Sequence, residues 1–174
     1  MQAFLQTVPT EIDKMIHVVL VEPEIPQNTG NIARTCAALG AKLHLVEPLG
    51  FIIDDKHVKR AGLDYWHLVE VETHPSFEDV KAKYPDFQYY YSTTKAPHRY
   101  DEVEYPKDVF IVFGKETKGL DENLLKDNLD DCIRIPMRKE ARSLNLSNAV
   151  AIVVYEAMRQ QGFDNLWQES DYFG

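Results

Sequence analysis

Residues 15–46 decide the fold of this chain. They consist of MIHVVLV at 15–21, EPEIPQNTGN at 22–31, IARTCAAL at 32–39 and, after Gly40, LHLV at 43–46. The first and last segments are short apolar runs, which predict buried strands, and the third predicts a helix that Gly40 ends. We expect the proline-containing second segment to be a loop. Strand, helix and strand in this order form a βαβ unit, which implies a parallel sheet with a right-handed crossover.

The rest of the chain continues this alternation. Further strands are expected at 68–71, 87–91, 108–113 and 132–137, and helices at 56–61, 77–84, 122–126 and in a last segment that runs to Gly162. In that last helix the residues expected to face the core are Val150, Val153, Val154 and Ala157. The chain shows no internal repeat and no linker. We therefore expect one α/β domain, a parallel sheet flanked by helices, at 15–163, with an extension at 1–14 and a tail at 164–174.

Composition limits the class of protein. The chain has 174 residues, of which 44% are hydrophobic and 27% charged, as in an ordinary soluble domain. The longest apolar run is too short to cross a bilayer, and the N-terminus lacks a signal-peptide pattern, so we expect a cytoplasmic protein without membrane attachment. Cys36 and Cys132 form no C-x-x-C pair, so we expect buried thiols and no metal site. His17 and His44 lie in apolar strands and are expected to be core or edge residues rather than ligands.

The charge balance argues against a protein that coats nucleic acid. The formal net charge is −9, which opposes bulk electrostatic binding but leaves room for a local basic surface. The basic residues that folding could bring together against phosphates are Lys56, Lys59, Arg60, Lys95, Arg99, Arg138 and Arg142.

A glycine-containing loop, GKETKGL at 114–120, follows the most apolar predicted strand. Its G-x-x-x-x-G spacing is that of a phosphate-binding P-loop, but Leu120 stands where that motif needs Lys-Ser/Thr. No G-x-G-x-x-G follows any predicted strand, which disfavours a nicotinamide or flavin dehydrogenase. The two glycines either make a tight turn or let backbone approach a ligand closely, and both readings stay open.

Two further loops carry more polar groups than a helix start requires. Before the last predicted helix, the small polar residues Ser143, Asn145, Ser147 and Asn148 fall within six positions. One of them suffices as an N-cap, so the others suggest that the loop presents groups to a ligand. The segment NTGNIAR at 28–34 is either a cap followed by a surface arginine or a loop toward which Arg34 points to meet an anionic group.

Three segments carry the strongest sequence motifs. They are NTGNIAR at 28–34, FGKETKGL at 113–120, and Ile135-Pro136-Met137 together with SLNLSNA at 143–149. In this order and spacing they resemble the SPOUT superfamily of RNA methyltransferases, within it the SpoU-type ribose 2′-O-methyltransferases, and most closely the small TrmL/YibK-like group. The resemblance runs from Met15 to about Phe163.

The resemblance implies a C-terminal trefoil knot in the sheet and a homodimer whose active site draws on both subunits. It implies methyl transfer from S-adenosylmethionine, with S-adenosylhomocysteine as product, to the ribose 2′-hydroxyl of the wobble nucleotide, a cytidine or modified uridine, of leucine tRNAs. By position, the cofactor-binding residues are Ser92, Thr93, Gly114, Glu116, Ile135, Pro136, Met137, Ser143 and Leu144.

The resemblance gives Arg34 the role of activating the 2′-hydroxyl, and we add Asn145 and Tyr155 as catalytic candidates. The acceptor of the ribose proton stays open among Glu116, Asn145 and Tyr155. A guanidinium stays protonated, so we assign Arg34 to stabilising the developing alkoxide or gripping the neighbouring phosphate rather than to taking the proton. Tyr155 also suits a core position in its helix. The basic residues named above would hold tRNA, and with this net charge we expect weak, salt-sensitive binding.

Other functions remain open from the sequence. The fold could serve a 2′-O-methyltransferase for another RNA, such as rRNA, or a non-catalytic RNA-binding or assembly factor. A nucleotide-binding α/β enzyme of another kind is a further alternative, which competition by ATP or a nicotinamide would reveal.

Overall fold

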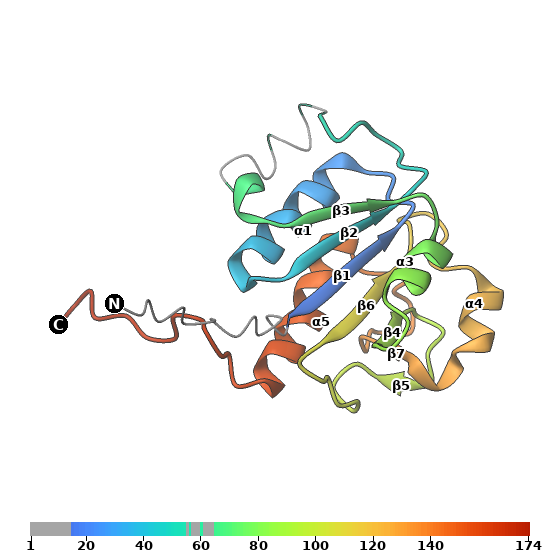
Figure 1. The fold of residues 1–174 in the computed structure, drawn as a ribbon. Coiled ribbons are helices and arrows are strands. Elements are labelled where there is room, and N and C mark those ends of the chain that lie inside the picture. The colour runs from blue at the N-terminus through green and yellow to red at the C-terminus, as the bar shows by residue number, and fades with distance from the viewer. Residues whose placement is uncertain (1–14, 55, 57–59, 61–64) are drawn as a thin grey trace, which may run out of the picture.

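The computed structural model describes residues 15–54, 56, 60 and 65–174, and its centre is one sheet between two layers of helices (Figure 1). The sheet has seven strands in the order β3-β2-β1-β6-β4-β7-β5, and all strand pairings are parallel. The strands are β1 (Ile16–Val21), β2 (Lys42–Val46), β3 (Val71–His74), β4 (Gln88–Ser92), β5 (His98–Arg99), β6 (Val109–Phe113) and β7 (Cys132–Arg134). The parallel α/β fold predicted from the sequence is confirmed.

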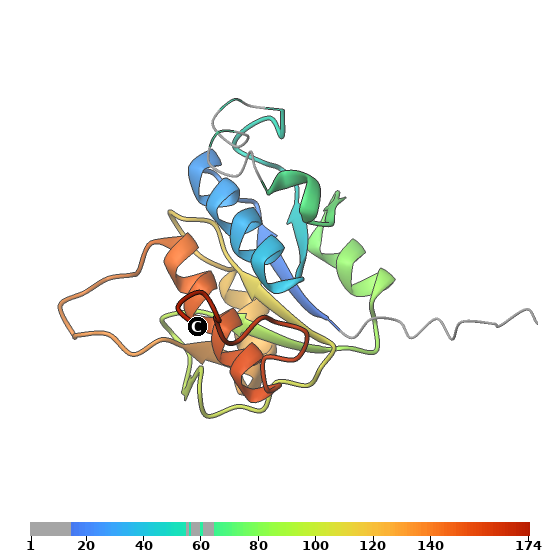
Figure 2. The ribbon, with the colours of Figure 1, turned by 90° about the vertical axis from the view of Figure 1, so that its left-hand side faces the viewer.

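The helices divide between the two faces of the sheet. They are α1 (Pro26–Leu39), α3 (Phe77–Lys83), α4 (Glu122–Asp127) and α5 (Leu146–Gln160), with single 3₁₀ turns at Trp66–Leu68 and Leu129–Asp131. The view in Figure 2 shows α1 and α5 on one side of the sheet and α3 on the other. Both faces of the central strands are therefore covered, which explains why their sequences are apolar throughout rather than alternating.

Two hydrophobic clusters fill the spaces between these layers. On the α1–α5 face, Leu20 and Ile111 pack in a cluster with Val154, and on the other face Val19 and Phe110 share a cluster with Val80 of α3. The thiols of Cys36 and Cys132 are buried and free, as expected. In α5, Val150, Val153, Val154 and Ala157 are all fully buried, which confirms the predicted core stripe.

The start of α1 corrects the sequence analysis. Residues 22–31 were expected to form a loop, yet the helix already begins at Pro26. Proline is well suited to the first helical position because it has no N–H to leave unpaired and its φ is already helical. Asn28 and Thr29 consequently lie inside the helix and are buried, so Asn28 is not the N-cap.

Other element predictions hold to different degrees. The strand expected at 68–71 is wrong in position, because a 3₁₀ turn occupies Trp66–Leu68 and β3 begins at Val71. The short edge strand β5 has only two residues and left no pattern in the sequence. The predicted helix at 56–61 and extension at 1–14 fall largely or wholly outside the described residues. Among the residues that the structure describes, no helix combines the length and apolar character needed to cross a membrane.

Candidate functional site

A cavity of about 540 Å³ lies at the carboxyl ends of β4, β6 and β7, where it meets the start of α5. Eight of the nine predicted cofactor-binding residues line it, namely Ser92, Thr93, Gly114, Glu116, Ile135, Met137, Ser143 and Leu144. The ninth, Pro136, is absent from the lining, although it lies between two residues that do line the cavity. Segments separated by up to about fifty residues of sequence thus meet at the carboxyl ends of the strands. Parallel α/β proteins bind their ligands at this end of the sheet.

The loop after β6 has a shape that only glycine allows. A Cβ on Gly114 would lie 2.1 Å from the carbonyl carbon of Gly119, and Gly119 has a φ of 68°, in the left-handed region. The N–H of Gly119 donates to the Lys115 carbonyl over 2.9 Å, which closes the turn. The two readings of this loop are therefore compatible, because the tight turn is also a wall of the cavity.

Glu116 joins this loop to the start of α1. Its carboxylate accepts the backbone N–H of Glu24 at 2.8 Å and that of Ile25 at 3.0 Å. Ile25 is the N-cap residue of α1 and has no capping side chain of its own, so a carboxylate from about ninety residues away supplies the missing acceptor. In return, the N–H and hydroxyl of Thr117 donate to the carboxylate of Glu24.

An amide chain connects the third motif to the other two. Asn145 Nδ2 donates to Asn28 Oδ1 over 3.1 Å, and Asn28 Nδ2 donates to Glu116 Oε1 over 3.3 Å. The other end of Asn145 caps α5, because its Oδ1 accepts the N–H of Ser147 at 2.9 Å. The three motif segments are therefore held together by one hydrogen-bonded chain. The roles of Glu24 and Asn28 in this chain left no signal in the sequence, since they depend on contacts between distant loops.

Arg34 lies on α1 outside the cavity lining. Its guanidinium carbon stands 4.6 Å from the centre of the Tyr65 ring, a cation–π distance, and its Nη2 lies 3.5 Å from the Tyr65 hydroxyl oxygen. Tyr155 also lies outside the lining, on the outer face of α5, with 47% of its surface exposed. The expectation that Tyr155 suits a core position is wrong, because the core stripe of α5 lies on the opposite side of the helix.

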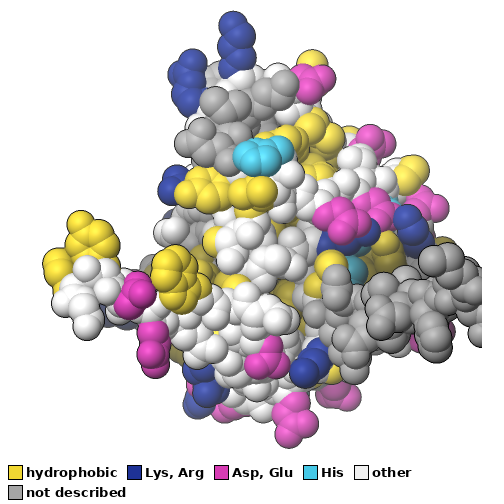
Figure 3. Space-filling model, turned by 60° about the vertical axis from the view of Figure 1, so that its left-hand side comes forward, with side chains coloured by type: hydrophobic (Ala, Val, Ile, Leu, Met, Phe, Trp, Pro, Cys, Tyr) yellow, Lys and Arg dark blue, Asp and Glu magenta, His cyan; other side chains and the backbone are white. Residues whose placement is uncertain are grey.

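The predicted RNA-binding residues that the structure describes do not form one surface within a single chain. Arg142 and Lys95 line the cavity, and Lys95 also pairs with Glu122 at 2.7 Å. Arg99 on the edge strand β5 pairs with Asp101 and Glu102. Lys56 and Arg60 are exposed after β2, near the opposite edge of the sheet, and Arg138 is exposed after β7, whereas Lys59 lies outside the described residues. On the face in Figure 3, basic and acidic side chains are intermixed from the upper to the lower end, with no continuous basic patch among the residues drawn in colour.

A second, larger cavity of about 840 Å³ adjoins the opposite side of the 114–120 loop. Its charged lining combines three lysines, Lys95, Lys115 and Lys118, with six acidic residues, Glu22, Glu47, Glu78, Asp121, Glu122 and Asp127. None of the predicted cofactor-binding residues belongs to its lining. We place the functional site in the smaller cavity because the motif residues converge there.

Comparisons with known proteins give the family of this chain. The family model described as the SpoU rRNA Methylase family matches residues 15–155. A Bacillus subtilis (strain 168) protein, provisionally named a tRNA (cytidine(34)-2′-O)-methyltransferase, is 52% identical over 154 residues, covering 87% of this chain and 96% of the relative.

Two solved structures extend the comparison. A structure described as giving insight into 2-OH methylation of C/U34 on tRNA superposes with a TM-score of 0.81 at 42% identity, covering 85% of this chain and 97% of that chain. An AdoMet-bound rRNA methyltransferase from Sinorhizobium meliloti superposes with a TM-score of 0.76 at 27% identity, covering 83% of this chain and 56% of that chain. With its three motif segments gathered around one cavity and most of its length matched by the family model, this chain belongs to the SpoU rRNA methylase family.

Proposed function

We propose that the protein methylates the ribose 2′-hydroxyl of nucleotide 34, the wobble nucleotide of tRNA, with S-adenosylmethionine (AdoMet) as donor and S-adenosylhomocysteine as product. The observation that carries the proposal is the convergence of all three motifs on one cavity in a chain that matches nearly the full length of relatives named for this reaction. As a finer part of the proposal, the substrates are leucine tRNAs with cytidine or modified uridine at this position.

The cavity suits AdoMet in size and chemistry. Its volume of about 540 Å³ lies within the range of roughly 300–1,000 Å³ typical of small-molecule sites. Ile135, Met137 and Leu144 offer an apolar wall for an adenine ring, and the glycine turn brings backbone within reach of the ligand. The sulfonium of AdoMet supplies the methyl group already activated, so the residues of the chain need only position the ribose and manage its proton.

The hydrogen-bonded chain assigns supporting roles to two motif residues. Both ends of the Asn145 side chain and both oxygens of Glu116 already take part in hydrogen bonds within the chain. We infer that Asn145 and Glu116 fix the walls of the cavity. The catalytic work then falls to Arg34, which remains protonated and stabilises the developing 2′-alkoxide or holds the adjacent phosphate.

A second copy of the chain would complete the site. Arg34 and Tyr155 both lie outside the cavity of their own chain, on the layer formed by α1 and α5. Exposed apolar side chains accompany them on or beside these helices, namely Ile25, Leu144 and Ile152. A homodimer that packs through this layer would bury these side chains and bring Arg34 and Tyr155 of one subunit toward the cavity of the other. The Tyr155 hydroxyl is then a candidate acceptor for the ribose proton.

Several finer features complete the proposal. The methyltransferase domain spans residues 15–163, with 1–14 and 164–174 as appendages, and its C-terminal part is threaded as a trefoil knot around the 114–120 and 135–145 loops. Dimer formation would collect the scattered basic residues into a tRNA-binding surface. The protein acts where its substrate is processed, in the cytoplasm.

The experiment that tests the function is methyl transfer to defined RNA. The purified protein is incubated with methyl-labelled AdoMet and total tRNA from cells that lack the gene, and 2′-O-methylated nucleotides are then mapped. We expect a single new modification at nucleotide 34 of leucine tRNAs. Transfer to rRNA instead would reassign the substrate, and normal AdoMet binding without transfer to any RNA would refute the enzymatic proposal.

A further inference from the structure

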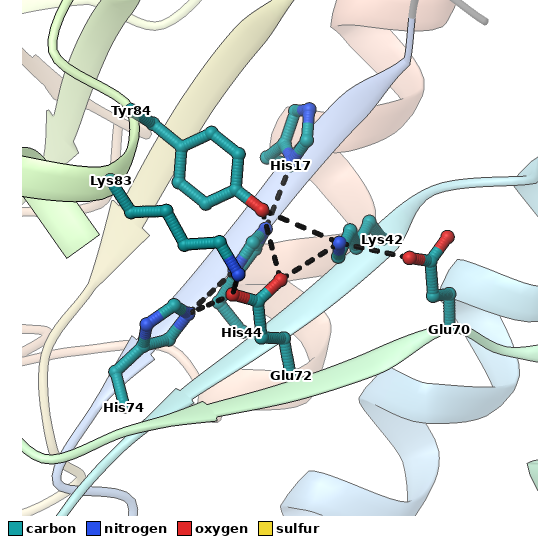
Figure 4. A network of polar contacts seen from close by, with 8 residues as sticks. All are labelled: His17, Lys42, His44, Glu70, Glu72, His74, Lys83 and Tyr84. Carbon is teal, nitrogen blue, oxygen red and sulfur yellow. Dashed lines mark hydrogen bonds and ion pairs between the residues drawn. The ribbon is translucent and has the colours of Figure 1, made fainter. Parts of the chain in front are cut away.

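Three histidines form a line across one face of the sheet, away from the cofactor cavity (Figure 4). His17 Nδ1 lies 2.9 Å from His44 Nε2, and His44 Nδ1 lies 2.9 Å from His74 Nε2. Only 7%, 0% and 4% of the surfaces of His17, His44 and His74 are exposed. Their strands β1, β2 and β3 are neighbours in the sheet, so parallel pairing places the rings side by side.

A carboxylate closes one end of this line. Glu72 of β3 pairs in register with His44 of β2, and its Oε1 lies 3.6 Å from His74 Nε2. His44 Nδ1, His74 Nε2 and a carboxylate oxygen of Glu72 all lie within 4.8 Å of one another, as potential ligands of one ion. Two imidazoles and one carboxylate are a ligand set that zinc and related divalent metals accept in proteins.

The ring nitrogens that would face a metal share one proton in the structure. His44 Nδ1 and His74 Nε2 lie 2.9 Å apart, so one of them donates an N–H and the other offers a lone pair. When His44 donates its Nε2–H to His17, the Nδ1 lone pair faces His74. Ligating histidines commonly donate their other N–H in this way, which fixes the ring orientation.

We propose that His44, Glu72 and His74 form a binding site for one divalent transition metal, of which Zn²⁺ is the best match, with His17 as the residue that orients His44. Tetrahedral zinc with bonds of roughly 2.0–2.2 Å places its ligand atoms roughly 3.3–3.5 Å apart. The observed separations of 2.9 and 3.6 Å lie on either side of that value. The metal takes the place of the proton that His74 Nε2 shares with His44, and that proton moves to Nδ1 of His74, so each ring keeps one N–H and stays neutral.

A lysine ammonium group already lies beside the Glu72 carboxylate, one of the proposed ligands. The ammonium of Lys83, at the end of α3, bonds Glu72 Oε1, and 57% of its side chain is exposed. Lys83 can therefore turn into water and release the carboxylate. The other nearby lysine, Lys42, is only 12% exposed and stays in place, with Glu70 at 2.9 Å and Glu72 at 2.8 Å balancing its charge. Metal and Lys83 thus compete for the same carboxylate oxygen.

The proposal departs from the expectation of no metal site that the sequence supports. His44 and His74 are 30 positions apart and belong to no ligand motif. Only the β2–β3 pairing brings them together, with Val46 opposite His74 and His44 opposite Glu72. The spacing of these residues along the chain therefore does not predict the cluster.

The test is calorimetric titration of Zn²⁺ into the chelator-treated full-length protein, with Co²⁺ absorption as a second measure of ligand type. We expect one ion per chain, a Co²⁺ spectrum typical of nitrogen and oxygen ligands, and no binding to H74A. H17F should weaken binding by about 10- to 100-fold, as loss of an orienting partner does. Absence of stoichiometric Zn²⁺ binding to the wild-type chain would overturn the proposal.

A variant of Lys83 should raise Zn²⁺ affinity, whereas the histidine variants should lower it. Lys83→Met removes the competing ammonium from an exposed position, so Zn²⁺ affinity should rise by about tenfold or more. Lys81→Met on the same helix, whose ammonium lies 3.9 Å from the Tyr89 ring centre instead, is the matched control and should leave affinity unchanged. Unchanged or weaker affinity in Lys83→Met would contradict the site even if the histidine variants fail to fold.

Discussion

Two polar clusters hold distant parts of this chain together, and they differ in the partners they use. Around the cofactor cavity, Glu116, Asn28 and Asn145 engage backbone N–H groups and one another at the ends of helices. Across β1–β3, His17, His44 and His74 bond to one another through their side chains, within a covered face of the sheet. The first cluster shapes loops at the rim of a cavity, whereas the second ties strands within the body of the fold.

This difference separates the expected consequences of mutation. Changes at the cavity rim should impair methyl transfer more than folding, because loops there can shift while the sheet persists. Changes among the histidines should affect stability or metal affinity and leave the cavity intact. The following predictions test that separation, from the largest expected effect to the smallest.

Gly114→Ala should have the largest effect on the cavity rim. The added Cβ would meet backbone atoms of Gly119 and Leu120 within 2.1–2.3 Å, so the turn must open. We expect loss of AdoMet binding and of measurable methyl transfer, with stability lowered by about 1–3 kcal/mol. Calorimetric AdoMet titration and thermal unfolding measure the two effects. Gly119→Ala is the control: it adds no close contact, and its positive φ alone should lower stability by about 1 kcal/mol.

Arg34→Ala should reduce transfer almost without touching stability. Arg34 is exposed and contacts mainly Tyr65, so its loss should change the free energy of unfolding by less than about 0.5 kcal/mol. If the guanidinium stabilises the alkoxide, kcat should fall by about 10²–10³-fold while the Kd for AdoMet stays the same. A variant that keeps its kcat and loses only affinity for tRNA would show that Arg34 grips phosphate instead.

The residues at the cavity rim were easier to predict from the sequence than the histidine cluster, for a physical reason. Residues that build a loop lie close together in sequence, so SLNLSNA at 143–149 could be read as an excess of capping groups, and Asn145 proved to be the cap. Strand pairing is a long-range relation, so single histidines on three strands give no local pattern. The same limit applies to Glu116, whose role as the cap of α1 depends on a loop about ninety residues away.

Acid should destabilise the fold through the histidine cluster. Burial, with a contribution from Lys42, lowers the pKa of His17 to about 4 from the ordinary value of 6.5. The unfolded chain therefore binds more protons than the native chain below pH 6.5, and stability falls as pH drops from about 6.5 to about 4. We expect His17 to contribute on the order of 3 kcal/mol to this loss. Urea unfolding at a series of pH values in metal-free buffer measures it, and H17F should flatten the slope; an equal slope in the variant would contradict the assignment.

Glu116→Gln should give the smallest of these effects. It tests whether a change at the cavity rim leaves the histidine cluster unaffected. The amide keeps the shape of the side chain but loses the negative charge that accepts the N–H groups of Glu24 and Ile25 at the start of α1. Because the contact is partly exposed, we expect a stability loss of about 1 kcal/mol. AdoMet affinity should fall as well, since the loop that Glu116 anchors is a wall of the cavity. Zn²⁺ affinity should not change, because Glu116 bonds to Glu24, Ile25 and Asn28 and not to the proposed metal ligands. If Glu116→Gln altered Zn²⁺ binding as much as AdoMet binding, the two clusters would be coupled through β1, which carries His17 and leads into the segment with Glu24 and Ile25, and the separation argued from their partners would fail.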